Sequence, residues 1–306
     1  MSNTEWLKAL DKLEKLANGS KLNRFLYNPI KYTFGILYSK IWYKLTKQEF
    51  NVTTKTFFDT TLHIKLPASL DIFLTRGKSH SSEIRLARYI LLNLKTSHHF
   101  IDIGAHYGYF SALAVALVSN SGKVLSIEAS PKTYEVLKKN CSSQANQVCI
   151  HTLVSDSVAK RIFYEFPNLY SEYNSFSIEQ YKDSDWFQNY PPNEVELNTN
   201  TVSTLIEEHE LIPNMIKIDV EGGEFEVVKG MQNLHSKYDL TIMMEYISQE
   251  RHNHPHKKAV ETLKSFGYQT YIIKNDGSLI IINDLDQHFL QNKIDSDNIV
   301  LKKLRN

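Results

Sequence analysis

Apolar and polar positions change their spacing along the last two thirds of the chain. From about residue 98, short apolar runs typical of strands are separated by stretches whose apolar residues recur at helical spacing. Strands that alternate with helices predict a doubly wound α/β fold, in which helices cover both faces of a mostly parallel sheet. Strands are expected at residues 100–103, 123–127, 147–154, 215–220, 240–246, 268–274 and 298–301, with 279–282 returning after the Asn275-Asp276-Gly277 turn.

The first 48 residues follow a different pattern. Leu7, Leu10, Leu13 and Leu16 recur at helical spacing, and a mixed aromatic and basic run follows Pro29. Two helices are expected, the second amphipathic. Nine Lys and Arg against three Asp and Glu give this segment a charge of +6, so the remaining 258 residues carry −5 of the total of +1.

Two interpretations of residues 29–47 stay open. A basic, aromatic-rich amphipathic helix can lie on an anionic membrane surface. It can equally pack its apolar stripe on the rest of the protein. We therefore expect either core packing or a peripheral membrane contact through this segment.

Three segments follow from these patterns. A basic helical extension is expected at 1–48, and residues 49–97 carry Thr-, Phe- and Ile-rich strands followed by a helix at 82–94 that together cap the next domain. The catalytic domain is expected at 98–306.

Charge, cysteine content and hydropathy limit which partners, cysteine states and locations are expected for this protein. A net charge close to zero gives no general attraction for nucleic acid, so no nucleic-acid partner is expected. Cys141 and Cys149 lack zinc-site spacing and are expected to be reduced thiols. No apolar run approaches the roughly 20 residues of a membrane-spanning helix. A cytoplasmic protein is expected, with the membrane surface as the alternative location.

The turn after the first strand of the domain carries the first chemical signal. Gly104 and Gly108 bound the loop G-A-H-Y-G, which leads into a helix at 109–119 and lacks the G-x-G-x-x-G pattern of dinucleotide sites. Asp102 precedes this loop, and a carboxylate there suits a cationic ligand better than a pyrophosphate. Both glycines are expected to let the backbone approach that ligand closely.

A second acid stands at the end of the next strand. Glu128 follows Asp102 by 26 residues and is placed to accept hydrogen bonds from ribose hydroxyls. Together the two acids favour S-adenosylmethionine as the cofactor. A nicotinamide-dependent oxidoreductase and a cofactor-binding scaffold without activity are the alternatives.

Three segments carry a family resemblance. FIDIGAHYGYFSALA (100–114), VLSIEASPKTYEVLKKN (124–140) and NMIKIDVEGGEFEVVKGM (214–231) resemble the FkbM-type methyltransferases, most closely in the K-I-D-V-E-G-x-E run at 217–224. The likeness covers roughly residues 55–305. His106 and Tyr107 depart from the smaller loop pair common in the family, and Gly223 stands where alanine is common.

The resemblance implies a Rossmann-like class I fold with a seven-stranded sheet whose last strand is antiparallel. It implies O-methylation of sugars, glycolipids or secondary-metabolite hydroxyls, so the partner is a small-molecule or glycan acceptor. The methionine end of the cofactor would lie at the first loop, its ribose at the second strand and its adenine after the third. The implied cofactor-binding residues are Asp102, Gly104, Ala105, His106, Gly108, Glu128, Ala129, Ser155, Asp156 and Asp219.

Transfer to a hydroxyl also needs a base or a metal ion, because a hydroxyl is a poor nucleophile at neutral pH. Asp219 and Glu245 follow central strands, where doubly wound sheets bind their ligands. They are the predicted catalytic acids, either sharing a proton or holding Mg²⁺. Glu221 is a predicted substrate contact, and the alternative for Asp219 is a cap on the following helix.

A histidine cluster is the third candidate. His252, His254 and His256 lie in a very polar segment, which favours a solvated loop. The alternatives are a metal site and a base carried on a lid, with His254 as the catalytic candidate.

Residues 157–200 form a predicted insertion for substrate recognition. The segment is rich in Tyr, Asn and Ser, and loops this long inside compact domains are usually functional or disordered. Aromatic faces with amide partners suit a carbohydrate, so Tyr170, Tyr173, Asn174 and Trp186 are the predicted contacts. The alternative is a surface loop without a ligand.

Overall fold

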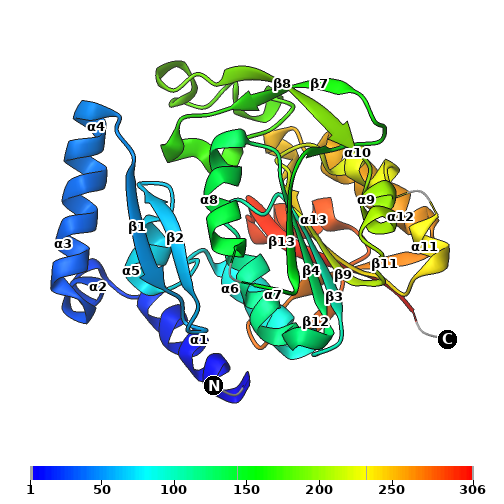
Figure 1. Cartoon of the computed structure of the whole chain (residues 1–306), viewed down its shortest axis with the longest axis horizontal. Helices are drawn as coiled ribbons and strands as arrows, with labels where there is room; N and C mark the ends of the chain where they lie inside the picture. The colour runs from blue at the N-terminus through cyan, green and yellow to red at the C-terminus, as the bar shows by residue number, and fades with distance from the viewer. Residues whose placement is uncertain (1–2, 143, 232, 305–306) are drawn as a thin grey trace.

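The computed structural model describes residues 3–142, 144–231 and 233–304. Its centre is an eight-stranded sheet (Figure 1). In spatial order the strands are β12 (Leu279–Ile281), β11 (Tyr268–Ile273), β13 (Ser296–Lys303), β10 (Thr241–Ile247), β9 (Pro213–Ile218), β3 (His99–Ile103), β4 (Lys123–Glu128) and β5 (Gln147–His151).

Strand direction follows the predicted pattern, and the returning segment predicted at 279–282 joins the sheet as an eighth strand. Strands β5, β4, β3, β9 and β10 are parallel, and β13 inserts antiparallel between β10 and β11. The count of seven is wrong because β12 also pairs with the sheet. After the Asn275-Asp276-Gly277 turn, Ile280 lies opposite Ile272 and extends the edge.

Alternate side chains of the central strands pack in two different hydrophobic cores, one on each face of the sheet. Phe100 packs in one hydrophobic cluster with helices α6 (Ser81–Asn93) and α7 (Tyr109–Val118), whereas the next residue, Ile101, packs in the other. That second cluster contains α9 (Val202–Glu208), α10 (Glu224–Lys229), α12 (His254–Ser265) and α13 (Leu285–Asn292). Successive side chains of a strand point to opposite faces, so the predicted doubly wound arrangement is confirmed.

Helix α8 (Pro131–Cys141) starts as its sequence predicts. Ser130 is the N-cap, its hydroxyl accepts a hydrogen bond from the Thr133 N–H at 3.2 Å, and Pro131 occupies the first turn. This cap fixes the chain directly after Glu128, at the end of β4.

The insertion folds into a small sheet of its own. Strands β6 (Leu153–Val154), β8 (Asn193–Asn200) and β7 (Lys160–Glu165) pair beside the main sheet, above α8 in Figure 1. Between β7 and β8, short 3₁₀ turns at Asn168–Tyr173, Glu179–Tyr181 and Phe187–Asn189 carry the aromatic residues.

The N-terminal segment contains more helices than predicted. Helices α1 (Asn3–Ala17), α2 (Lys21–Tyr27) and α3 (Pro29–Leu37) are followed by a π-helical turn at Tyr38–Trp42 and α4 (Tyr43–Thr46). The extra boundary falls at Ser20, which caps α2 by accepting from the Asn23 N–H at 3.2 Å. A hairpin of β1 (Phe50–Lys55) and β2 (Thr61–Leu66) and a short helix α5 (Leu70–Thr75) lead into α6.

Helix α1 is tied to the rest of the protein by apolar and ionic contacts. Leu10 and Leu13 are buried in the cluster that also contains α6 and Phe100. Arg88 of α6 donates to Asp11 at 2.6 Å and to Glu14 at 2.7 Å. None of the described helices is long and apolar enough to cross a lipid bilayer.

The prediction of two reduced thiols is wrong. Cys141, the last residue of α8, and Cys149, in β5, form a disulfide with Cα atoms 6.6 Å apart. The helix and the strand lie side by side, which brings together two cysteines whose spacing of eight residues matches no ligand pattern. The sequence alone carried no signal for that contact.

Candidate active site

A cavity of about 400 Å³ opens at the carboxyl ends of the central strands. Its walls come from the loop after β3, the end of β4, the segment before β6, the loop after β9 and the end of β10. The segment between α5 and α6 and part of the insertion close the other side. This is the edge of the sheet at which the sequence predicted a ligand.

Gly104 makes a contact that the sequence did not predict. Its φ is +78°, and a Cβ on it would lie 1.8 Å from the backbone oxygen of Asp219. The glycine therefore lets the loop after β3 touch the loop after β9, backbone against backbone. Gly104, Ala105 and His106 line the cavity, while Gly108 lies at the start of α7 and faces Leu137.

Glu128 lies at the predicted place on the cavity wall, beside Ala129. One carboxylate oxygen accepts from the Ser130 N–H at 2.9 Å and the other from the His106 N–H at 2.8 Å. Burial raises the pKa of Glu128 to about 7, against the opposing effect of those two backbone hydrogen bonds. The side chain is thus held rigidly with its remaining lone pairs available to ribose hydroxyls.

The wall beyond Glu128 is apolar, but it differs from the sequence prediction by a few residues. Leu153, Val154 and Phe163 line the cavity. Ser155 is buried outside it, and Asp156 pairs with Arg161 at 2.7 Å and with Lys229 at 2.6 Å. The residues that reach the cavity are therefore Leu153 and Val154 of β6, and the predicted adenine contacts Ser155 and Asp156 lie just outside it.

A lysine that was not predicted organises the acids beneath the cavity. Lys217 Nζ lies 2.9 Å from Asp219 Oδ2 and 3.6 Å from Asp102 Oδ1. Asp102 does not line the cavity; it is buried, and its Oδ2 accepts from Ser111 Oγ at 2.6 Å. Burial alone would lower the pKa of Lys217, but Asp219 and Asp102 outweigh it and raise that pKa.

Three acids converge on the cavity floor. One carboxylate oxygen from each of Asp219, Glu221 and Glu245 lies within 4.8 Å of the others, so these residues could together hold a metal ion. The helix-cap alternative for Asp219 is wrong, because α10 begins at Glu224 with Gly223 as its N-cap.

The three acids differ in their affinity for protons. Burial would raise the pKa of Asp219, but Lys217 outweighs it and holds that pKa below its usual value. Burial, with the charges of Asp219 and Glu224, raises the pKa of Glu245 to about 8. Burial and the Glu245 charge raise the pKa of Glu221, whose carboxylate also accepts from the Tyr181 hydroxyl. Asp219 is therefore an anion, and Glu245 can exchange a proton near neutral pH.

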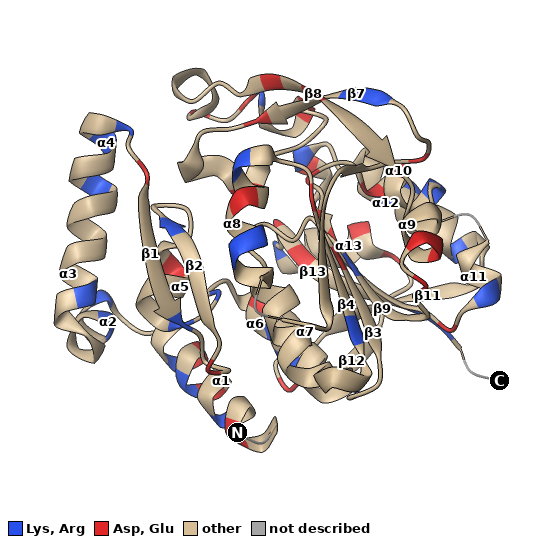
Figure 2. Ribbon diagram, in the orientation of Figure 1, with Lys and Arg blue, Asp and Glu red and all other residues tan. Residues whose placement is uncertain are grey.

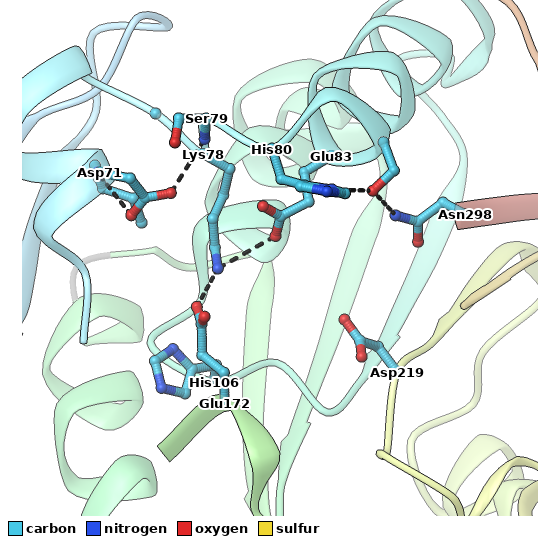
Figure 3. A network of polar contacts seen from close by, with 12 residues as sticks. Asp71, Lys78, Ser79, His80, Glu83, His106, Glu172, Asp219 and Asn298 are labelled. Atoms are coloured by element: carbon cyan, nitrogen blue, oxygen red, sulfur yellow. Dashed lines mark hydrogen bonds and ion pairs between the residues drawn. The ribbon is translucent and has the colours of Figure 1, made fainter. Parts of the chain in front are cut away.

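The opposite wall carries a polar network that sequence reasoning missed. Lys78 Nζ lies 3.2 Å from Glu83 and forms a shorter contact with Glu172, joining the segment before α6 to the insertion. Burial raises the pKa of Glu83 to about 8 and lowers that of His106 to about 4. Figure 3 shows Asp219 apart from Lys78 and Glu172. No spacing or pattern in the sequence links these residues.

The predicted insertion contacts divide into two groups. Tyr173 and Asn174 line the cavity together with Ser171 and Glu172. Tyr170 and Trp186 do not; their rings stack with centroids 4.1 Å apart inside an aromatic cluster that holds the insertion together. Residues 171–174 thus lie at the cavity wall, and their contact with a ligand stays a prediction.

The histidine cluster does not reach the cavity. His254 is exposed at the start of α12, and His252 is exposed beside Asp183. His256 is buried with its Nε2 3.2 Å from Glu224, and burial lowers its pKa to about 3. The geometry of the described residues thus brings Arg251, and none of these histidines, to the cavity wall.

A sequence model of the Methyltransferase FkbM domain matches residues 102–270. These 169 residues are more than half of the 306-residue chain. The chain belongs to the FkbM methyltransferase family. It is an S-adenosylmethionine-dependent methyltransferase, so the nicotinamide alternative is wrong.

Solved structures resemble this FkbM methyltransferase only distantly. Precorrin-6y C5,15-methyltransferase from Geobacter metallireducens is 14% identical, with 72% of this chain and 87% of that chain covered and a TM-score of 0.39. Fibrillarin from Aeropyrum pernix, with natively bound S-adenosylmethionine, is 11% identical over 71% and 74%, with a TM-score of 0.38. An O-methyltransferase from Thermotoga maritima is 12% identical over 83% and 78%, with a TM-score of 0.39. No curated protein sequence matches the chain.

The residues of the FkbM methyltransferase fit its cofactor. Glu128 offers a fixed acceptor for ribose, Leu153 and Val154 offer an apolar surface for adenine, and Asp219 offers a negative charge for a sulfonium. Asp102 Oδ1 is buried without a hydrogen-bond partner, which leaves an acceptor beneath the loop. When bound, S-adenosylmethionine supplies an electrophilic methyl group.

Proposed function

We propose that this FkbM methyltransferase methylates a hydroxyl oxygen of a carbohydrate-containing acceptor, such as a sugar or a glycolipid. The observation that carries the proposal is the convergence of Asp219, Glu221 and Glu245 in the same cavity as the loop after β3. A hydroxyl acceptor needs such acids, because its proton must be removed as the new bond forms.

On the donor side, Glu128 binds the ribose hydroxyls and the loop at 104–106 lies along the methionine part of the cofactor. Asp219 is kept ionised by Lys217, 2.9 Å away, and faces the positive sulfur as an anion. An anion that already holds its charge attracts a sulfonium but is a weak base. We therefore assign Asp219 to donor binding and catalysis by charge.

On the acceptor side, Glu245 removes the proton. The acceptor oxygen forms its bond to the methyl carbon as the carbon–sulfur bond breaks, and the hydroxyl proton passes to a Glu245 carboxylate oxygen. A pKa of about 8 suits this task, since the ionised form is present near neutral pH and is basic enough to accept a proton.

The carbohydrate part of the proposal rests on the opposite wall. Lys78, Glu83 and Glu172 present polar hydrogen-bonding groups, and Asn174 adds an amide beside the ring of Tyr173. Sugars combine several hydroxyls with an apolar ring face, so they match donors and acceptors next to an aromatic side chain. Few other neutral acceptors would use so many polar groups.

Calorimetric titration tests the donor assignment. S-adenosylmethionine and S-adenosylhomocysteine should bind the wild type, NAD should not, and Glu128→Gln, which changes the ribose acceptor on the cavity wall, should weaken binding of both. Tight NAD binding, or unchanged binding in the variant, contradicts the donor site. Binding of the cofactor without turnover on any acceptor identifies the inactive scaffold instead.

Transfer assays with methyl-labelled donor and a panel of glycosides and glycolipids test the chemistry. Glu245→Gln should lose transfer and keep cofactor binding, and Asp219→Asn should lose transfer and bind S-adenosylmethionine more weakly. Glu250→Gln, an exposed acid on the neighbouring turn, should stay active. The product should resist mild base, as an ether does and an ester does not. Full activity of both variants contradicts the proposed roles.

A metal-assisted version of the same reaction is the second candidate. It is favoured by the three oxygen ligands that lie within 4.8 Å of one another. Activity that is lost on treatment with a chelator and restored by Mg²⁺ would assign the acids to metal binding. Activity unaffected by the chelator supports proton transfer to Glu245.

A further inference from the structure

Exposed apolar side chains gather on one part of the molecule. We call residues 21–46, which comprise α2, α3, the π-helical turn and α4, the helical arm. Of the 21 large hydrophobic residues that are exposed among the described residues, ten lie in this arm. They are Leu22, Phe25, Leu26, Tyr27, Ile30, Phe34, Leu37, Ile41, Trp42 and Leu45. The arm is a small part of the chain, so this is a concentrated apolar surface.

The exposed residues share one side of the arm. Ile30, Phe34, Leu37, Ile41 and Leu45 follow one another at intervals of three or four residues, which places them on one helix face. Ile30 is 83% exposed and Leu45 is 78% exposed.

The other face of the arm already packs on the protein. Gly35, Tyr38 and Tyr43 are buried, and Tyr38 donates to the Gln48 carbonyl at 2.6 Å. This buried face agrees with core packing, one of the two interpretations given above for residues 29–47. Phe34 lies at the boundary and its ring contacts Phe50 and Phe73. The other residues of the apolar stripe, Ile30, Leu37, Ile41 and Leu45, stay more than half exposed.

The charge of this region has a single sign. Residues 15–48 contain seven Lys and Arg and no Asp or Glu. Figure 2 shows blue and no red along α3 and α4, which form one edge of the molecule. Lys21, Lys40 and Lys44 are exposed, whereas Lys31 turns inward to Thr54.

We propose that the helical arm docks on the surface of an anionic lipid bilayer. The apolar stripe enters the boundary between headgroups and acyl chains, and the exposed lysines meet lipid phosphates. Tyr27 and Trp42, both about half exposed, are of the type that sits at a membrane interface. This inference is independent of the identity of the acceptor.

Charge complementarity decides between the bilayer and other occupants. A second copy of the arm would bring together two surfaces whose charged side chains are all positive, and like charges repel. Nucleic acid would satisfy the lysines but would leave the aliphatic stripe exposed to water. An anionic bilayer is the surface that matches both features.

Sedimentation with vesicles tests the proposal. The full chain should pellet with vesicles of mixed phosphatidylglycerol and phosphatidylcholine and should stay in solution with phosphatidylcholine alone. Lys40→Glu with Lys44→Glu should lower the partition constant onto these vesicles by roughly fivefold or more per lysine. The matched control is Lys138→Glu with Lys139→Glu, an exposed pair on α8, which should bind as the wild type does.

A second pair of variants tests the apolar stripe. Ile30→Ser with Leu45→Ser should lose vesicle binding, whereas Val158→Ser with Leu290→Ser, which are 71% and 74% exposed elsewhere, should keep it. All four positions are exposed, so folding should be preserved, and circular dichroism checks this. Vesicle binding that is equal in arm and control variants overturns the proposal. Dimers that form without lipid and are lost in the arm variants also overturn it.

Discussion

Lys217 Nζ lies 2.9 Å from Asp219 Oδ2, and the same ammonium lies 3.6 Å from Asp102 on the neighbouring strand. One buried cation thus balances two acids at the floor of the active site. Lys217 is in β9 and Asp102 is in β3, so the charge also links the two strands whose loops form the donor site.

Lys217→Met should destabilise the protein by roughly 3 to 5 kcal/mol, because it leaves two carboxylates in low-dielectric surroundings without their counterion. Denaturant unfolding measures the loss. Lys229→Met breaks the ion pair between a half-exposed lysine and Asp156, and should lower the free energy of unfolding by less than about 1 kcal/mol. Equal losses in the two variants would show that Lys217 carries no special electrostatic role.

Glu245 should make the stability of the cofactor-free protein depend on pH. Its pKa is raised in the folded state, so the folded protein binds the proton more tightly than the unfolded chain. The stabilising contribution is present below the ordinary value of 4.5 and is lost as pH rises through about 8. The melting temperature of Glu245→Gln, measured across this range, should fall less with pH than that of the wild type. A matching slope for Glu245→Gln would contradict the raised pKa, and Glu250→Gln serves as the control.

Gly104→Ala should abolish cofactor binding and destabilise the protein. The new Cβ would lie 1.8 Å from the Asp219 backbone oxygen, and backbone atoms cannot move aside as a flexible side chain can. Gly267→Ala is the matched control, since Gly267 also has a positive φ and has nothing within 4 Å of the added atom. The control should lower the free energy of unfolding by about 1 kcal/mol, because alanine is strained in a left-handed backbone. Gly104→Ala should lower it by roughly 3 kcal/mol more. Similar losses would mean that the loops can separate easily.

Glu128→Gln should weaken binding of S-adenosylmethionine by roughly 10- to 100-fold, which is the loss expected when a hydrogen bond to a charged group is removed. Calorimetry measures this effect. Glu135→Gln, an exposed acid on α8, should bind the cofactor as the wild type does. An unchanged affinity for Glu128→Gln would move the ribose away from the end of β4.

The Cys141–Cys149 disulfide predicts that denatured, unreduced protein contains no free thiol. Thiol titration checks this directly. Replacing both cysteines with serine should lower the free energy of unfolding by about 2.5 kcal/mol, the loop-closure value for a crosslink this short. Two reactive thiols in the unreduced protein would rule out the bond.

The local parts of the site could be predicted from the sequence. Gly104 and Asp219 directly follow strands and Glu128 is the last residue of one, and the carboxyl ends of parallel strands meet at one edge of a sheet. Their convergence therefore needs only the strand pattern. The family segments add the identity of the cofactor to the same positions.

The remaining parts depend on contacts between distant segments. Lys78 and Glu172 are 94 residues apart and meet only because the insertion folds over the segment before α6. Trp186 was predicted to face a ligand, but its partners in the insertion attract it into an aromatic cluster. Neither contact has a signature in spacing or composition, since both are set by how the insertion packs.

The contact of Gly104 with the Asp219 backbone oxygen has a consequence for how the site is assembled. The loop at 104–106 and the loop that carries Asp219 and Glu221 meet there without any intervening side chain, whereas Glu245 is held separately in β10. In the proposed reaction, folding of the chain therefore positions the donor loop and Asp219 together, and the base is positioned by a different strand.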